Sequence, residues 1–345
     1  MKSFLLLAFL FVFAFINSQN RELTNKKLIQ YHEAVNSAED KIVTNDLDSA
    51  DFYYRKAFKH FNKPHANDVY AFKHYQSLNC MNYKFEDHFL SVNFPNHKNY
   101  KKLKCTNKFD NDYRKQLDEL FVSDQHYRKL SGGDYAKYKK EITRNDSITS
   151  TKLLQLIQKK GFPNEYDLSL SSADPVFFQN FYFIIWHQLA TSLYKPQVVN
   201  FSSEIVKALN KGKITPDNAA FLLDLSNGTT DYSAKYFDIV QILKNEGNSE
   251  RPHDVVEEML EKADCCYVHE WFYPEKRGEK GNALVKDIDR RRKSIGMSTL
   301  DQNLRKKVFL LTNNDYKMGR ANLIGINFKI DEDAENLKKH FIKIK

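Results

Sequence analysis

Glycine, proline, cysteine and tryptophan are scarce in this chain of 345 residues, which has 11 Gly, 8 Pro, 4 Cys and 2 Trp. So few glycines and prolines exclude a collagen-like or low-complexity protein and argue against an all-β fold with many turns. Four cysteines are too few for a disulfide-dense scaffold. The hydrophobic share of 41% is too high for a disordered chain, and the length allows two modest cores.

Long hydrophobic runs are confined to the first sixteen residues. Lys2 precedes an unbroken apolar run from Phe4 to Ile16, and polar residues follow from Asn17 to Asn20. A helix of that length spans about 20 Å, less than the roughly 30 Å of a bilayer's hydrocarbon core. The pattern predicts a secretory signal peptide over residues 1–20, cleaved near Gln19, with an uncleaved anchor or a buried helix as the alternative. We therefore expect a periplasmic or secreted protein with no transmembrane segment after cleavage.

The four cysteines lack the spacing of a zinc site, because no Cys-x-x-Cys or Cys/His pattern is present. Cys80 and Cys105 are predicted to pair in an oxidising compartment, with ordinary buried thiols as the alternative. Cys265 and Cys266 are adjacent, and disulfide geometry makes a bridge between neighbours strained. We expect no metal and no cofactor, since phosphate loops, dinucleotide fingerprints and calcium loops are also missing.

The chain divides by pattern into a signal peptide (1–20), a helical repeat-like module (21–112), a larger helical domain (113–305) and a C-terminal extension (306–345). In the module, Ala50, Tyr54 and Ala57 form a helical stripe that resembles the second helix of a tetratricopeptide repeat. A simple helical hairpin is the alternative, and a second hairpin is predicted over residues 67–92.

Helical periodicity continues through the larger domain, and the most apolar segment, Val176 to Tyr194, predicts a central buried helix. A polar loop is predicted from Pro274 to Gly281. The predicted fold is mainly α with a small β element near the C-terminus. Further helices are expected at 114–128, 148–160, 203–211, 219–225, 254–264 and 287–293, a strand pair at 308–311 and 323–330, and a last basic helix in the tail.

His187 is the only histidine inside a strongly apolar segment, which makes it a candidate general base or ligand. A histidine satisfied by hydrogen bonds in the core or an interface is the alternative. The basic runs His97–Lys104, Arg290–Lys293 and Lys338–Lys345 suit acidic glycans or anionic lipids, or simply a solvated face. Nucleic acid is not an expected partner of an exported protein.

Several short motifs occur in a fixed order between residues 115 and 305: Asp124-Gln125-x2-Arg128, Gly161-Phe162-Pro163, Ile185-Trp186-His187, Ala219-x2-Leu222-x-Asp224 and Asp289-x-Arg291-Arg292-x3-Gly296-Met297. This ordered series resembles the bacterial domain of unknown function 6624 family. The resemblance implies export and a helical N-terminal extension. It implies no particular activity, because none is established for the family.

The chain departs from the family's pattern around the central histidine. The family carries Gln-His-Ala-Asp where this chain has Trp186-His187-Gln188-Leu189, and an Asp-Arg pair where this chain has Asp224-Leu225. If the family's polar residues form a pocket, this chain has lost several of them.

Three hypotheses follow from the sequence. The first is an exported interaction or scaffold module that binds an unidentified protein partner, because no complete catalytic constellation is present. The second is an exported hydrolase-type enzyme with His187 in a helical cleft and, as its partners, Asp124, Arg128, Asp224, Arg291 and Arg292. The third is a binder of anionic cell-surface polymer. The surroundings of His187 distinguish the second from the first, since proton transfer needs polar groups within about 2.6–3.2 Å of the imidazole.

Overall fold

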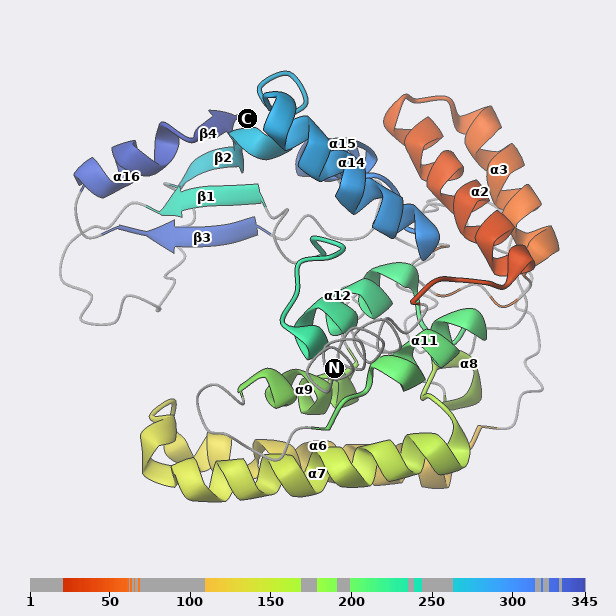
Figure 1. Ribbon diagram of the computed structural model, residues 1–345, viewed down its shortest axis with the longest axis vertical. Coiled ribbons are helices and arrows are strands. Elements are labelled where there is room, and N and C mark those ends of the chain that lie inside the picture. The colour runs from red at the N-terminus through yellow and green to blue at the C-terminus, as the bar shows by residue number, and fades with distance from the viewer. Residues whose placement is uncertain are drawn as a thin grey trace, which may run out of the picture.

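The protein is mainly α-helical, with one four-stranded sheet in its C-terminal third, as predicted (Figure 1). The computed structural model describes residues 21–61, 63, 65, 68, 109–168, 179–190, 199–234, 239–243, 263–313, 318, 323–328 and 331–344. The predicted signal peptide, the Cys80–Cys105 bridge and the basic run His97–Lys104 lie outside the described residues, as does the hairpin over 67–92 except for Asp68.

The first two helices, α2 (Lys26–Val43) and α3 (Leu47–His60), form an antiparallel hairpin. Asn25 caps α2 by accepting hydrogen bonds from the first-turn N–H groups, and Asp46 caps α3 in the same way. The stripe predicted for α3 is its buried face, formed by Ala50, Tyr54 and Ala57.

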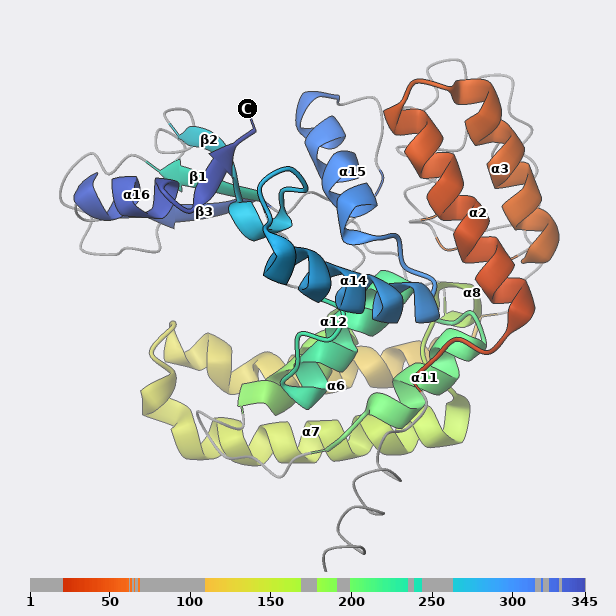
Figure 2. The same cartoon turned by 45° about the horizontal axis from the view of Figure 1, so that its top comes forward.

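Two long helices, α6 (Asn111–Ser131) and α7 (Lys139–Lys160), lie side by side along one edge of the molecule in both ribbon views (Figure 1; Figure 2). Gly132 ends α6 in the left-handed conformation at φ 60°, and the short helix η3 (Tyr135–Tyr138) leads into α7. Against this pair pack α8 (Glu165–Leu168) and α9 (Asn180–Trp186) with η4 (His187–Ala190). Helix α12 (Pro216–Asn227) packs on α9 and η4, and α11 (Ser202–Asn210) packs on α12.

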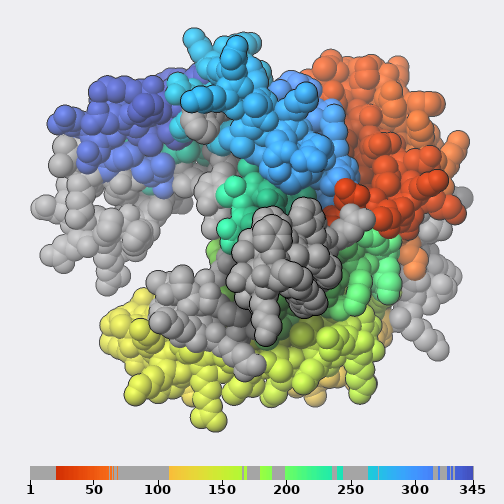
Figure 3. Space-filling view, viewed as in Figure 1, coloured from red at the N-terminus to blue at the C-terminus, as the bar shows by residue number. Residues whose placement is uncertain are grey.

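One apolar core joins the N-terminal segment to the larger helical domain. Leu23 and Leu28 belong to the same buried cluster as Leu153 of α7 and Ile184 of α9. The space-filling view shows the α2–α3 hairpin in continuous contact with α14 (Glu279–Ser294) and α15 (Leu300–Thr312) (Figure 3). Residues 21–61 therefore pack as part of the same body as the helices that follow.

The segment before α2 is fastened to residues far along the chain. The Leu23 N–H donates to the Ser294 carbonyl at 2.8 Å, and the Thr24 N–H donates to Asn210 Oδ1 at 2.7 Å. The Asn210 amide in turn donates to the Glu22 carbonyl at 3.1 Å. Leu23 itself is only 3% exposed, so its side chain anchors the segment in the core.

The sheet has the strand order β3-β1-β2-β4. Strand β2 pairs antiparallel with β1 and β4, and β1 pairs parallel with β3. Cys265 and Cys266 of β2 form a disulfide between adjacent residues. The strands are β1 (Ile239–Leu243), β2 (Asp264–His269), which continues into η5 (Glu270–Phe272), β3 (Leu323–Asn327) and β4 (Phe341–Lys343), with α16 (Asp331–Lys338) before β4.

The predicted strand at Val308–Leu311 is wrong, because these residues lie in α15. Thr299 and Gln302 form a capping box that starts this helix, and Leu304, Val308 and Leu311 lie at helical spacing and pack against the sheet. The other half of the predicted pair is strand β3, whose partner is β1 instead.

Three other boundaries differ from prediction. The tail is not a basic helix, since α16 begins with three acidic residues and β4 follows it. Asp264 begins β2 rather than ending a helix; residues 254–262 lie outside the described residues. The loop predicted to extend to Gly281 ends earlier, because α14 begins at Glu279.

Among the described residues, no helix combines the length and the apolar character needed to cross a lipid bilayer.

Gly296 provides a test of how the hairpin packs on the turn after α14. Its φ is 90°, and a Cβ added there would lie 3.0 Å from His32 Cβ of α2. Gly133 has a similar φ of 96° but open space around it. We expect Gly296→Ala to lower the free energy of unfolding by about 1–2 kcal/mol more than Gly133→Ala in urea denaturation. Equal losses in the two variants would contradict the close packing against His32.

Candidate functional site

Three helical segments bring together four polar side chains that are mostly buried. Asp124 and Arg128 lie one turn apart on the same face of α6, because residues at i and i+4 are neighbours on a helix. Asp146 lies on the buried face of α7, and His187 follows directly after α9. The packing of α9 against both long helices brings the imidazole to the carboxylates.

His187 is hydrogen-bonded to Asp124 through its Nδ1 atom. The distances from Nδ1 to the two carboxylate oxygens of Asp124 are 3.0 Å and 2.9 Å. The Gln125 amide donates to one of the same oxygens at 2.7 Å. The Asp124 side chain is 0% exposed, whereas 16% of the His187 side chain is exposed. In the described part of the chain, no residue forms a hydrogen bond with Nε2 of His187.

Arg128 and Asp146 form a bidentate ion pair beside the imidazole. Nη1 and Nη2 of Arg128 donate to the two oxygens of Asp146 at 2.8 Å and 2.7 Å. Nη1 also donates to the backbone carbonyl of Asp124 at 2.9 Å, and it lies 3.7 Å from the Asp124 carboxylate. The Gln188 amide donates to the backbone carbonyl of Asp146 at 3.3 Å. These bonds fix both carboxylates in position.

Burial is the main influence on the protonation of this ion pair. Burial raises the pKa of the Asp146 carboxyl, and the Arg128 guanidinium opposes that rise. Burial also acts to lower the pKa of Arg128, but Asp146 outweighs it, so that the pKa of Arg128 lies above its usual value. Arg128 is therefore always positively charged, and its charge favours the ionised form of the Asp146 carboxyl.

A group of aromatic rings lies next to the imidazole. The Phe183 ring centroid lies 6.4 Å from that of His187, and Trp186 stacks on Phe183 with an interplanar angle of 10°. Phe221 of α12 meets the indole edge-on at 5.9 Å, and Phe121 of α6 lies 6.0 Å from Phe183. Trp186 is nevertheless 37% exposed.

The donor set also has the composition of a cation site. Asp124, Asp146 and His187 each place one ligand atom within 4.8 Å of the others. Both oxygens of Asp146, however, already accept from Arg128. A divalent cation would have to displace the guanidinium from its carboxylate. The contacts therefore fit a hydrogen-bonded acid–base site better than a metal centre.

The other three predicted site residues gather elsewhere, around the loop that follows α12. Asp224 is buried and accepts hydrogen bonds from the N–H groups of Tyr232 and Ala234 at 3.2–3.3 Å. Arg292 is 1% exposed and donates to the Tyr232 carbonyl at 2.9 Å. Arg291 donates to the Asp231 carbonyl at 2.7 Å.

These contacts give the second group a structural role, because most of them hold the backbone of one loop. Burial raises the pKa of Asp224 to about 6, against the opposing hydrogen bonds from Tyr232 and Ala234. Among the described residues, no hydrogen bond or ion pair links the group to His187. Of the predicted partners, Asp124 contacts the imidazole directly, whereas Asp224, Arg291 and Arg292 contact the loop around Tyr232. A joint action of these residues with His187 stays a prediction.

Sequence reasoning missed Asp146. The sequence nevertheless carries a signal for this residue, because Asp146 is the one carboxylate in a stripe of uncharged residues at helical spacing along α7. The members of the stripe, all buried, are Ile142, Asp146, Thr149 and Leu153. A charged residue on a buried face needs a partner, and Arg128 is that partner.

The fold and the site together define a helical protein with a buried Asp–His pair supported by an Arg–Asp ion pair. Comparisons with protein-family models, with curated proteins and with solved structures found no match. The resemblance to the domain of unknown function 6624 family stays a prediction from the sequence motifs.

Proposed function

We propose that the protein is an exported hydrolase-type enzyme in which His187 acts as general base and Asp124 orients it. The observation that carries this proposal is the hydrogen bond of 2.9–3.0 Å between Nδ1 of His187 and the buried carboxylate of Asp124. Export is supported by the apolar segment from Phe4 to Ile16 alone.

A buried carboxylate at Nδ1 determines which nitrogen carries the proton. Asp124 accepts from Nδ1–H, so the lone pair of the neutral imidazole is on Nε2, the atom that can take a proton. The Asp124 carboxylate stays hydrogen-bonded to Nδ1–H when Nε2 takes a proton, so it faces the imidazolium that general-base catalysis creates.

The reaction that this pair suits is the hydrolysis of an ester. Nε2 removes a proton from water as the water oxygen attacks the acyl carbon, and the imidazolium then returns that proton to the leaving alkoxide. Ester and water become carboxylic acid and alcohol, with no net change in the enzyme. In this proposal water is the nucleophile.

The interaction hypothesis is supported by large apolar side chains at the surface of the described residues. Phe52 of α3 is 63% exposed, and its ring meets Tyr53 edge-on. Val122 and Leu130 of α6 are 64% and 55% exposed. These side chains lie on different helices, whereas a stable partner typically buries about 800 Å² on each side. The acid–base site, whose groups contact one another directly, is the stronger candidate.

The anionic-polymer hypothesis loses support from intramolecular ion pairs. In the run Arg290–Lys293, Arg290 and Arg291 pair with Asp287, and Arg292 is buried. In the tail, Lys338 and Lys343 both pair with Asp264. The two carboxylates, Asp287 and Asp264, thus offset part of the charge that suggested an anion-binding surface.

The proposal is tested by ester hydrolysis with purified protein. We expect wild type to hydrolyse p-nitrophenyl acetate and triacetin above the buffer rate, and His187→Gln to lose about 100-fold in kcat/KM, as removal of a general base does. His126→Gln, which changes an exposed histidine of α6, is the matched control and keeps wild-type activity. Absence of turnover by wild type, or equal rates for His187→Gln and wild type, would overturn the proposal.

A further inference from the structure

Trp186 is the largest exposed apolar group beside the proposed base. It immediately precedes His187, and it is one of only two tryptophans in the chain. Phe183 supports the indole by stacking at 5.8 Å, and Phe221 contacts it edge-on at 5.9 Å. The indole is therefore held between two elements, α9 and α12, and still leaves 37% of Trp186 exposed.

A ring held in this way loses little conformational freedom when a ligand stacks on it. The rings of Trp186 and His187 both lie next to the ring of Phe183, at centroid distances of 5.8 Å and 6.4 Å, so the indole and the imidazole share one aromatic neighbour. A flat group stacked on Trp186 would thus lie beside the imidazole. The site combines an apolar platform with an adjacent group that can take a proton.

The charges at the site indicate what kind of flat group it accepts. A nucleotide would bring phosphates that need cations, but the guanidinium of Arg128 already pairs with Asp146 and is 8% exposed. The two carboxylates of the site would also repel an anion. A pyranose ring has a flat face of C–H groups that stacks on indole, and it carries hydroxyl or acyl groups at its rim rather than charge.

We propose that the substrate is an O-acylated saccharide whose pyranose ring stacks on Trp186 and presents its ester to His187. This inference rests on the proposed hydrolase function. The reaction is saccharide ester plus water giving saccharide hydroxyl plus carboxylic acid, with the proton passing through Nε2 of His187 as in any ester hydrolysis. Trp186 binds the ring and takes no part in proton transfer.

The test compares two acetyl esters, one with a pyranose ring and one without. We expect Trp186→Ala to lower kcat/KM for glucose pentaacetate, mainly through KM, about 10-fold more than it lowers kcat/KM for triacetin. Trp186→Phe keeps a smaller aromatic platform and is expected to recover part of the loss. Circular dichroism checks that both variants fold, which is expected because Trp186 is partly exposed.

Each outcome separates this inference from the function on which it rests. If Trp186→Ala lowers the two rates equally, or neither, the sugar platform is overturned while the hydrolase function stands. If wild type hydrolyses neither ester, the hydrolase function fails, and glucose pentaacetate is then titrated against tryptophan fluorescence. Loss of the fluorescence quenching in Trp186→Phe would support sugar binding at Trp186 independently of any hydrolysis. Identical quenching in wild type and Trp186→Phe would overturn sugar binding at Trp186.

Discussion

Replacing Asp146 by alanine is expected to lower the free energy of unfolding by about 3–5 kcal/mol, because it leaves a buried guanidinium without its carboxylate. Both terminal nitrogens of Arg128 lose the Asp146 oxygens at 2.7–2.8 Å, and Nη1 keeps only the Asp124 backbone carbonyl at 2.9 Å. Only 8% of the Arg128 side chain reaches solvent. The remaining carboxylate, Asp124, is 3.7 Å away and already bonded to His187. Urea denaturation followed by circular dichroism measures the loss.

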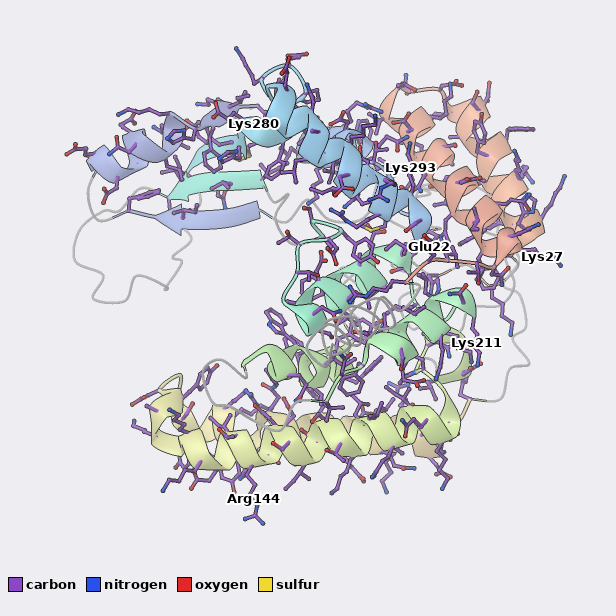
Figure 4. All side chains as sticks on the ribbon, in the orientation of Figure 1. Glu22, Lys27, Arg144, Lys211, Lys280 and Lys293 are labelled. Carbon is purple, nitrogen blue, oxygen red and sulfur yellow. A yellow bond between two sulfur atoms is a disulfide. The ribbon has the colours of Figure 1, made fainter. Side chains whose placement is uncertain are left out.

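The matched control is Arg144→Ala on the same helix. Arg144 points away from the molecule (Figure 4), so its removal is expected to change the free energy of unfolding by less than about 0.5 kcal/mol. A second variant, Arg128→Met with Asp146→Leu, replaces both charges by apolar groups and is expected to recover most of the stability. If Asp146→Ala were as stable as Arg144→Ala, the ion pair would not be the buried contact described above.

Stability is expected to fall as the pH rises from about 4 to about 7, through the ionisation of Asp224. Its pKa is about 6 in the folded protein and 3.8 ordinarily, so in this range the unfolded chain releases the proton before the native protein does. The native state binds more protons, and raising the pH therefore favours unfolding. A shift of about two units corresponds to a loss on the order of 3 kcal/mol, complete above pH 7.

Asp224→Asn isolates this contribution, because the amide is neutral at every pH. The difference in free energy of unfolding between wild type and Asp224→Asn should decrease as the pH rises from 4 to 7 and then stay constant. Urea denaturation at five or six pH values gives that difference. A difference independent of pH would show that the carboxyl is not buried as described, and an increase with pH would mean that the folded protein favours its ionised form.

The helices predicted from the sequence agree with the structure where the capping and turn residues give strong local signals. The α12 helix starts with Thr215 as its cap and Pro216 at its first position and ends at Gly228 in the left-handed conformation. Each of these residues affects only the backbone next to it in the sequence, so the local pattern is sufficient to predict the helix. Strand β1 has no such signal: its partners, β2 and β3, come more than twenty and more than eighty residues later.

The candidate site shows the same difference between local contacts, which the sequence predicts, and long-range contacts, which it does not. Asp124 and Arg128 are one turn apart on a single helix, so their proximity follows from spacing. His187 reaches Asp124 across 63 positions of sequence, and Arg128 reaches Asp146 across 18, through the packing of three helices. Asp224 and Arg292 belong to the same ordered series of sequence motifs as these residues. Their contacts differ, because they hold the backbone of the loop around Tyr232.

The anchoring of the first described residues also determines the order in which the chain can fold. Leu23 and Thr24 bond to residues that lie 186 or more positions later, at Asn210 and Ser294. As the chain emerges from the ribosome, α14 must be made before the Leu23 contact can form. Contacts between residues so far apart in the sequence form slowly during folding. The segment from residue 21 to residue 25 is therefore expected to reach its final position among the last parts of the described chain.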